Sequence, residues 1–339
     1  MSKLIPGSNE WLDSVTETII EPERLIIDPH HHLWRRADGN DYLLENLWRD
    51  TGSGHNIQKT VFVECHAEYR PDGPEALKVL GETEFVTQQA IASESADGHE
   101  RNATISGIVG HADLTLGDQV QEILSQHIEL AQGRFKGIRH AGAHAEHPDA
   151  LMIAGRAPKA LYLNPEFQNG VQKLGELDLS FDTWHYHYQN TEFDTLAKSA
   201  PGTQMILDHF GTPLGVGPYA SQRDEIFAQW KKDIAKIASN PNVVAKIGGL
   251  AMPDNGFGWH QRATPPDSDE FVEAQRDYYL HTIDCFGPDR CMFESNFPVD
   301  RFSLSYPVLY NGLKKIVADF SEADKHAMFY GTAERIYKL

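Results

Sequence analysis

The feature that most constrains the fold is a series of eight short apolar segments, most of which end in polar side chains. They cover residues 24–32, 59–67, 104–114, 135–140, 179–187, 204–211, 243–250 and 290–298. Between them lie amphipathic segments at 73–93, 116–133, 166–178, 191–201, 221–239 and 269–287, whose apolar residues recur every three or four positions. Eight such units in about 300 residues predict a (β/α)8 TIM barrel.

The chain shows no division into separate domains. No Gly/Ser-rich linker or block of like charge interrupts it. We therefore expect one barrel domain over residues 24–339, preceded by an N-terminal extension over residues 1–23. A doubly wound open sheet is the alternative, but the chain has no GxGxxG or GxxxxGK[ST] loop that would bind a nucleotide.

Composition limits the partners. A formal net charge of -19 disfavours nucleic acid and anionic membranes, so a small-molecule substrate is the expected partner. No apolar run approaches the roughly 18 residues that span a bilayer, and the N-terminus does not resemble a signal peptide. Cys65, Cys285 and Cys291 form no CxxC pair, which is typical of a reducing cytoplasm. The sequence leaves the oligomeric state open, including a homo-oligomer.

Chemically active side chains follow the predicted strands. In a TIM barrel the active site lies at the C-terminal ends of the strands, so these residues are expected to converge. In chain order they are Asp28, His30, His32, Glu64, His66, Arg139, His140, Asp182, His185, His187, Asp208, His209, Lys246, Glu294, Asn296 and Asp300.

The stretch "DPHHHLW" predicts a pair of inward imidazoles. Because strand side chains alternate between faces, His30 and His32 should point into the barrel mouth and His31 toward the helices. Two imidazoles side by side suit a metal ion or a substrate oxyanion. Asp28 is expected to be structural, and Cys65 to face the helix layer.

The strand-end motifs, taken in order, resemble a known family. "IIDPHHHLW", "FKGIRH", "LSFDTWHYHYQ", "MILDHFGTP", "NPNVVAKIGGLAM" and "FGPDRCMFESNFPVD" are similar to the amidohydrolase-2 branch of the amidohydrolase superfamily, in its lactonase-like group. That group contains L-fuconolactonase, L-rhamnono-lactonase and 2-pyrone-4,6-dicarboxylate lactonase. The resemblance implies a barrel hydrolase that opens a lactone ring. It also implies a divalent metal, zinc being one candidate, held by His30, His32, His209 and His185.

The eighth strand departs from the family pattern. The superfamily has an aspartate, a metal ligand and proton shuttle, where this chain has Asn296. An amide is not a general base near neutral pH and is a poor zinc ligand. Since some lactonases of this group work without a metal, the change weakens the metal prediction more than the lactonase prediction. The cofactor is therefore either a divalent metal or none.

These residues lead to a mechanistic hypothesis for a sugar-derived or aromatic-catabolic lactone. His30, His32 and His209 stabilise the oxyanion, directly or through a bound ion. The general base is Glu64 or Asp300, with Glu64 preferred, and Asn296 is a candidate to hydrogen-bond the substrate. The expected substrate-binding residues are Arg139, His185, His187 and Lys246, although a structural ion pair is the alternative role for Arg139 and Lys246.

Two other functions stay open. The first is a metal-dependent, non-oxidative decarboxylase of an aromatic or enoic acid, which Asn296 disfavours. The second is a non-catalytic ligand-binding barrel, which Asn296 favours. The loops expected to select the substrate, 34–50, 140–162 and 251–270, are rich in Trp, Tyr, His and Arg and do not identify it.

Overall fold

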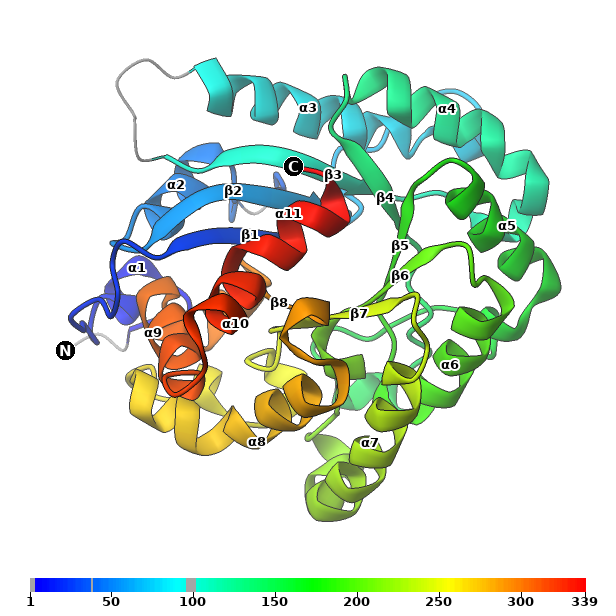
Figure 1. Cartoon of the computed structure of the whole chain (residues 1–339). Helices are drawn as coiled ribbons and strands as arrows, with labels where there is room; N and C mark the ends of the chain where they lie inside the picture. Colours follow the sequence, from blue (N-terminus) through cyan, green and yellow to red (C-terminus); the bar gives the residue numbers. More distant parts are fainter. Residues whose placement is uncertain (1–3, 38, 96–101) are drawn as a thin grey trace.

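The chain folds into a barrel of parallel strands surrounded by helices, as the sequence predicts (Figure 1). The computed structural model describes residues 4–37, 39–95 and 102–339. The eight strands pair in chain order within one sheet. They are β1 (Leu25–His31), β2 (Asn56–Val63), β3 (Thr104–Gly110), β4 (Phe135–Arg139), β5 (Ser180–Thr183), β6 (Gln204–Leu207), β7 (Val243–Ile247) and β8 (Cys291–Phe293).

Helices form the outer layer of the barrel (Figure 1). The predicted amphipathic segments overlap with α3 (Leu80–Ser95), α4 (Gln121–Leu130), α5 (Pro165–Glu176), α6 (Asn190–Ser199), α7 (Arg223–Ala238) and α8 (Ser268–Phe286). The predicted loop 34–50 is partly wrong, because α2 (Leu44–Thr51) begins within it; position 38 of that loop lies outside the described residues. The remaining helices are α1 (Asn9–Leu12), α9 (Tyr306–Ile316), α10 (Glu322–His326) and α11 (Thr332–Tyr337).

An apolar layer fills the N-terminal half of the barrel interior. It consists of side chains from alternate strand positions, with α11 lying across that end (Figure 1). The strand residues are Ile27, Val61, Val63, Val109, Ile206, Val244 and Met292, and Ala333 and Tyr337 of α11 pack onto them. The opposite strand face packs against the helices in the main core. Polar residues that continue the inward face must therefore lie on top of this layer.

The barrel closes through the segment that follows β8. The backbone N–H of Asn296 donates to the His30 carbonyl at 3.0 Å, and the N–H of His32 donates to the Phe297 carbonyl at 2.8 Å. Buried Asp28 reinforces the junction by accepting from the Ser295 N–H at 2.9 Å and from the Tyr306 hydroxyl at 2.9 Å. Asp28 thus has the structural environment expected for it.

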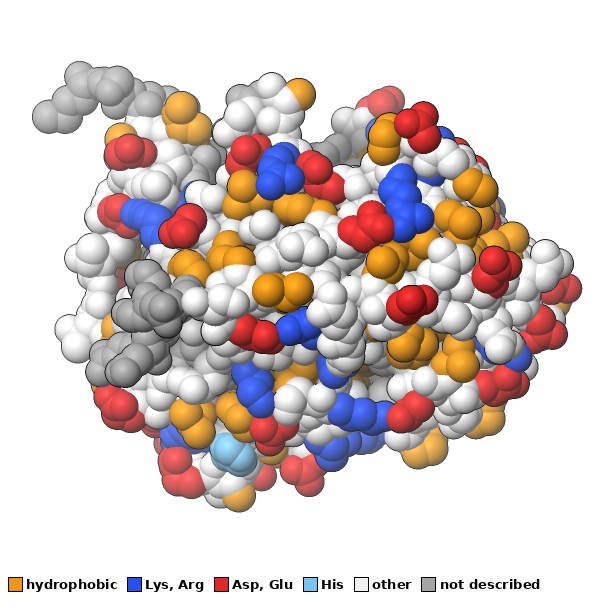
Figure 2. All heavy atoms as spheres, turned by 90° about the horizontal axis from the view of Figure 1, so that it is seen from above, with side chains coloured by type: hydrophobic (Ala, Val, Ile, Leu, Met, Phe, Trp, Pro, Cys, Tyr) orange, Lys and Arg blue, Asp and Glu red, His pale blue; other side chains and the backbone are white. Residues whose placement is uncertain are grey.

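The surface has mixed charge. On the face shown in Figure 2, acidic, basic and hydrophobic side chains are interspersed, without a continuous basic area. Within the described part of the chain, no helix is both long and apolar enough to cross a membrane.

Candidate active site at the C-terminal end of the barrel

Three imidazoles meet at the centre of the barrel. The ring of His30 lies 5.0 Å from that of His32 and 4.6 Å from that of His209, between ring centroids. All three side chains are buried, and burial lowers the pKa of each below its usual value. His31 instead packs against Phe62, a residue of the outer core. The alternation expected from "DPHHHLW" is therefore present.

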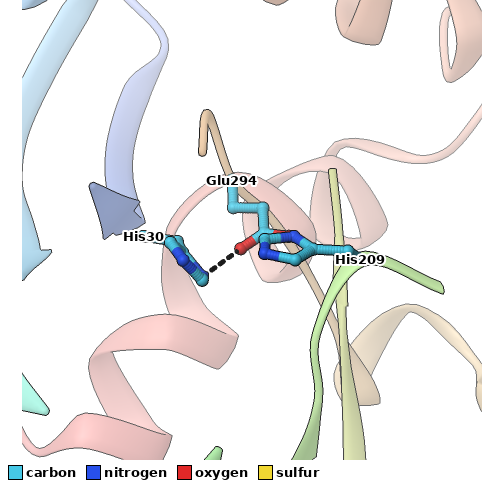
Figure 3. A group of neighbouring side chains, drawn as sticks. All are labelled: His30, His209 and Glu294. Carbon is cyan, nitrogen blue, oxygen red and sulfur yellow. Dashed lines mark hydrogen bonds and ion pairs between the residues drawn. The ribbon is translucent and has the colours of Figure 1, made fainter. Parts of the chain in front are cut away.

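Glu294 joins two of these imidazoles (Figure 3). Its Oε2 lies 2.8 Å from His30 Nδ1, and its Oε1 lies 2.8 Å from His209 Nδ1. A carboxylate in this position holds protons on both Nδ1 atoms and leaves both Nε2 atoms as lone pairs. His32 has the same tautomer, since its Nδ1 lies 2.8 Å from the Val63 carbonyl. Burial raises the pKa of Glu294 to about 8, against the effect of Lys246, and the tautomers of His30 and His209 are those that accompany its ionised form.

A buried lysine lies between the imidazoles and the apolar layer. Lys246 Nζ donates to Asp182 Oδ2 at 2.6 Å and lies 3.4 Å from His30 Nδ1. The Tyr337 hydroxyl donates to the same Asp182 oxygen at 2.5 Å. Although burial alone would lower the pKa of Lys246, Asp182 and Asp208 outweigh it and raise that pKa. Lys246 therefore forms an ion pair, which was one of the two roles expected for it.

Asp208 occupies the space among these basic groups. Its oxygens lie 3.6 Å from Lys246 Nζ, 3.8 Å from His30 Nδ1 and 3.9 Å from Arg139 Nη1. Neither oxygen has a hydrogen-bond partner among the described residues. Burial raises the pKa of Asp208 above its usual value, against the effect of Lys246. These separations suit a bridging water molecule.

Arg139 is paired with Glu64. Its Nε donates to Glu64 Oε1 at 2.7 Å and its Nη2 to the Glu64 carbonyl at 2.5 Å, which leaves Nη1 at 3.3 Å from His30 Nε2. Burial alone would raise the pKa of Glu64, but Arg139 outweighs it and lowers that pKa. A carboxylate with a lowered pKa is a weak base, so this geometry does not favour the general-base role expected for Glu64.

The two candidates after β8 bind each other. Asn296 Nδ2 donates to Asp300 Oδ1 at 2.8 Å, and the other Asp300 oxygen accepts from the Ala251 N–H at 3.0 Å. Both residues are buried. Burial raises the pKa of Asp300 well above its usual value. The two side chains thus shape the turn after β8, and the structure gives no contact between them and the imidazoles.

His185 and His187 lie apart from the imidazole group. His185 contacts Thr183 Oγ1 through Nδ1 at 3.0 Å and Asn190 Oδ1 through Nε2 at 2.9 Å, so both of its ring nitrogens are occupied. His187 accepts from the Leu214 N–H at 3.3 Å and contacts the Tyr219 ring. We therefore leave both residues out of the site that we propose, although they were expected to bind substrate or metal.

The predicted substrate-selecting loops 140–162 and 251–270 contact each other. Asp254 accepts from the backbone N–H groups of Met152 and Ile153 at 2.7 and 2.9 Å. A small hydrophobic cluster includes Ala143 of the first loop together with Tyr186 and Tyr219.

The donor atoms at the barrel centre fit a divalent ion. His30, His209 and Glu294 each offer a ligand atom within 4.8 Å of the others, and imidazole and carboxylate are ligands that zinc accepts. Asn296 is engaged with Asp300 and adds no carboxylate. Lys246 Nζ and Arg139 Nη1 lie 3.4 and 3.3 Å from the two His30 nitrogens. These two cations reduce the affinity that we expect for a metal.

Sequence reasoning placed Glu294, Asp208 and Asp182 among the strand-end residues that converge but gave none of them a catalytic, metal-binding or substrate-binding role. Glu294 and Asp208 directly follow a strand and Asp182 lies within β5, and a signal for them existed in the alternation of side chains. Glu294 shares the inward face with Met292, and Asp208 shares it with Ile206. Their pairing with particular histidines and lysines depends on contacts between distant strands.

Comparison with known proteins identifies the family. The Amidohydrolase family model (Amidohydro_2) matches residues 27–339, so the chain belongs to this family, as the strand-end motifs indicate. An uncharacterized protein, y4mH, of Sinorhizobium fredii is 31% identical over 93% of this chain and 98% of its own length. An L-fucono-1,5-lactonase of Burkholderia multivorans is 26% identical over 93% of this chain and 96% of its own length.

Solved structures share the fold. A crystal structure of an amidohydrolase from Burkholderia multivorans with bound zinc has a TM-score of 0.71 at 23% identity, covering 93% of this chain and 99% of that one. A second crystal structure of such an amidohydrolase from that organism, with bound HEPES, has the same TM-score at 24% identity and the same coverage.

Proposed function

We propose that this protein hydrolyses a lactone, with water attacking the ring carbonyl at the C-terminal end of the barrel. The observation that carries the proposal is the convergence of His30, His32, His209, Arg139 and Asp208 at one buried centre. Hydrolysis needs a donor for the developing oxyanion and a base for the water, and this centre offers both. The similarity to an L-fucono-1,5-lactonase supports a lactone as substrate.

Arg139 is the oxyanion donor in this proposal. Its Nη1 is the guanidinium nitrogen that Glu64 leaves free, and it points to the barrel centre. The sequence suggested the imidazoles for this role. However, their Nδ1 atoms are engaged with Glu294 and Val63, so the Nε2 atoms present lone pairs, which accept protons and do not donate them.

Asp208 is the general base. It holds the attacking water, takes its proton and later returns that proton to the ring oxygen when the carbonyl carbon–oxygen bond of the ring breaks. A raised pKa suits this role, since a base is most effective when its pKa lies near the working pH. The product is a hydroxy acid, whose carboxyl group releases one proton to solvent.

The surrounding residues position these groups. Glu64 holds the Arg139 guanidinium through two contacts, and Glu294 orients His30 and His209. When a divalent ion is bound, His30, His209 and Glu294 are the residues that hold it, and its contribution is to polarise the carbonyl as a Lewis acid.

A substrate panel with two detectors tests the proposal. The purified protein is given five- and six-membered lactones and, separately, aromatic and enoic acids, while proton release and carbon dioxide are measured. We expect lactone-dependent proton release above the spontaneous rate and no carbon dioxide. Carbon dioxide release from an acid would identify a decarboxylase instead. Thermal stabilisation by a lactone without any product would indicate a ligand-binding barrel.

A further inference from the structure

The guanidinium that could clamp a substrate carboxylate is already occupied by the protein. Arg139 Nε donates to the Glu64 side chain at 2.7 Å, and Nη2 donates to the Glu64 carbonyl at 2.5 Å. A guanidinium binds a carboxylate best through two parallel N–H groups. Glu64 thus takes up the fork formed by Nε and Nη2, and Nη1 lies 3.3 Å from His30 Nε2, so a substrate carboxylate would have to share the guanidinium with both residues. Both side chains are almost fully buried, so solvent does not weaken their pairing.

The charge balance around Arg139 disfavours an anionic substrate. Within the described residues of the barrel centre, the cations are Lys246 and Arg139, and each is in contact with carboxylates. The carboxyl groups there are Glu64, Asp182, Asp208 and Glu294. A carboxylate on the substrate would therefore meet no unpaired cation. The same balance helps release of the product, because ring opening turns a neutral lactone into a carboxylate.

A row of three imidazoles, those of His66, His111 and His140, begins beside Glu64. The ring of His66 lies 5.5 Å from that of His111, which lies 4.8 Å from that of His140. The His66 side chain is 68% exposed, so the row reaches the surface at this point. The proposed hydrolysis uses none of these three imidazoles.

The hydrogen-bonding atoms of this row match hydroxyl groups. Glu64 Oε2 is buried, has no hydrogen-bond partner among the described residues and lies 3.7 Å from His66 Nε2. His111 Nδ1 lies 3.0 Å from the Arg139 carbonyl, so its Nε2 is an acceptor. His140 Nδ1 accepts from the Leu114 N–H at 3.2 Å, so its Nε2–H is a donor. Hydroxyl groups on a substrate can donate to the first two and accept from the third, whereas a carboxylate can only accept.

We infer that the substrate is an uncharged, hydroxylated lactone and that Glu64 is the residue that selects it. Glu64 does so by occupying Arg139 and by presenting a bare acceptor oxygen to a substrate hydroxyl. The inference rests on the proposed lactonase function and narrows it, since it favours a sugar-derived lactone over one that carries further carboxylates.

Binding of stable analogues tests the inference independently of turnover. The probes are a sugar δ-lactam and its counterpart in which the terminal CH2OH is oxidised to a carboxylate, both titrated calorimetrically. We expect the wild type to bind the neutral lactam at least about 10-fold more tightly. The variant Glu64→Gln leaves the positive charge of Arg139 without its carboxylate partner, so this preference should fall below about 3-fold. Glu68→Gln is the matched control, because Glu68 is exposed on the same loop and pairs with Arg35.

Each outcome is decisive. Equal or tighter binding of the carboxylated lactam by the wild type overturns the inference, as does binding of neither lactam. A preference that persists in Glu64→Gln, or that falls equally in Glu68→Gln, overturns the role of Glu64. If the neutral lactam is preferred but no lactone is hydrolysed, the proposed function fails while the inferred ligand preference stands.

Discussion

Replacing Lys246 with methionine should strongly destabilise the barrel. Lys246 Nζ lies 2.6 Å from Asp182 and 3.6 Å from Asp208, and all three side chains are fully buried. Removing one partner of a buried ion pair leaves an uncompensated charge and costs about 3–5 kcal/mol. A chain of 339 residues unfolds with an entropy of about 0.7 kcal/mol/K, so Tm should fall by about 4–7 °C.

Differential scanning calorimetry of three variants tests this reasoning. Lys232→Met removes the same charge from an exposed position on α7 and should leave Tm within about 1 °C of the wild type. The double variant Lys246→Met/Asp182→Asn also removes the charge of one of the two carboxylates that have lost Lys246, so it should recover part of the loss in Tm. The reasoning is refuted if Lys246→Met has the same Tm as the wild type, or if the Tm of the double variant is no higher than that of Lys246→Met.

Three further outcomes follow from the structure. Burial lowers the pKa of His127 to about 4, so this side chain binds fewer protons in the folded state than in the unfolded chain. About 3 kcal/mol of stability should therefore be lost as pH falls from 6.5 to 4. The free energy of unfolding of His127→Asn, measured over the same pH range, should not show this loss. Asn296→Asp should lower Tm, because the new carboxylate faces Asp300, and should change the affinity for zinc by less than about 3-fold, because the structure gives no contact between this side chain and the imidazoles; a calorimetric titration showing a rise of about 10-fold would contradict this. His185→Leu should lower stability by about 1–3 kcal/mol through its lost hydrogen bonds and leave the KM for the lactone unchanged, whereas a raised KM would return His185 to the substrate site.

The barrel could be predicted because its signal is local. Each strand is a short apolar run, and the polar residues that follow must meet at one end of a closed parallel sheet. The alternation of side chains also placed His30 and His32 on one face and His31 on the other, as the ring contacts show. These features depend only on neighbouring residues and on the periodicity of a strand.

The pairing of site residues could not be predicted in this way. Glu64 and Arg139 are 75 residues apart, and their ion pair lowers the pKa of Glu64. His185 was expected at the rim, but β5 ends at Thr183, and beyond that point the alternation no longer applies. The bond between Asn296 and Asp300 depends on the turn that closes the barrel. In each case a tertiary contact determines the role that the residue type leaves open.

The most direct test of the central claim is the rate of lactone hydrolysis by Asp208→Asn. A general base contributes about 10²–10⁴-fold to such a reaction. We predict that kcat falls at least about 100-fold on the best neutral lactone while Tm is maintained, because an amide replaces a buried carboxyl group that has no hydrogen-bond partner among the described residues. Wild-type turnover by Asp208→Asn would contradict the account.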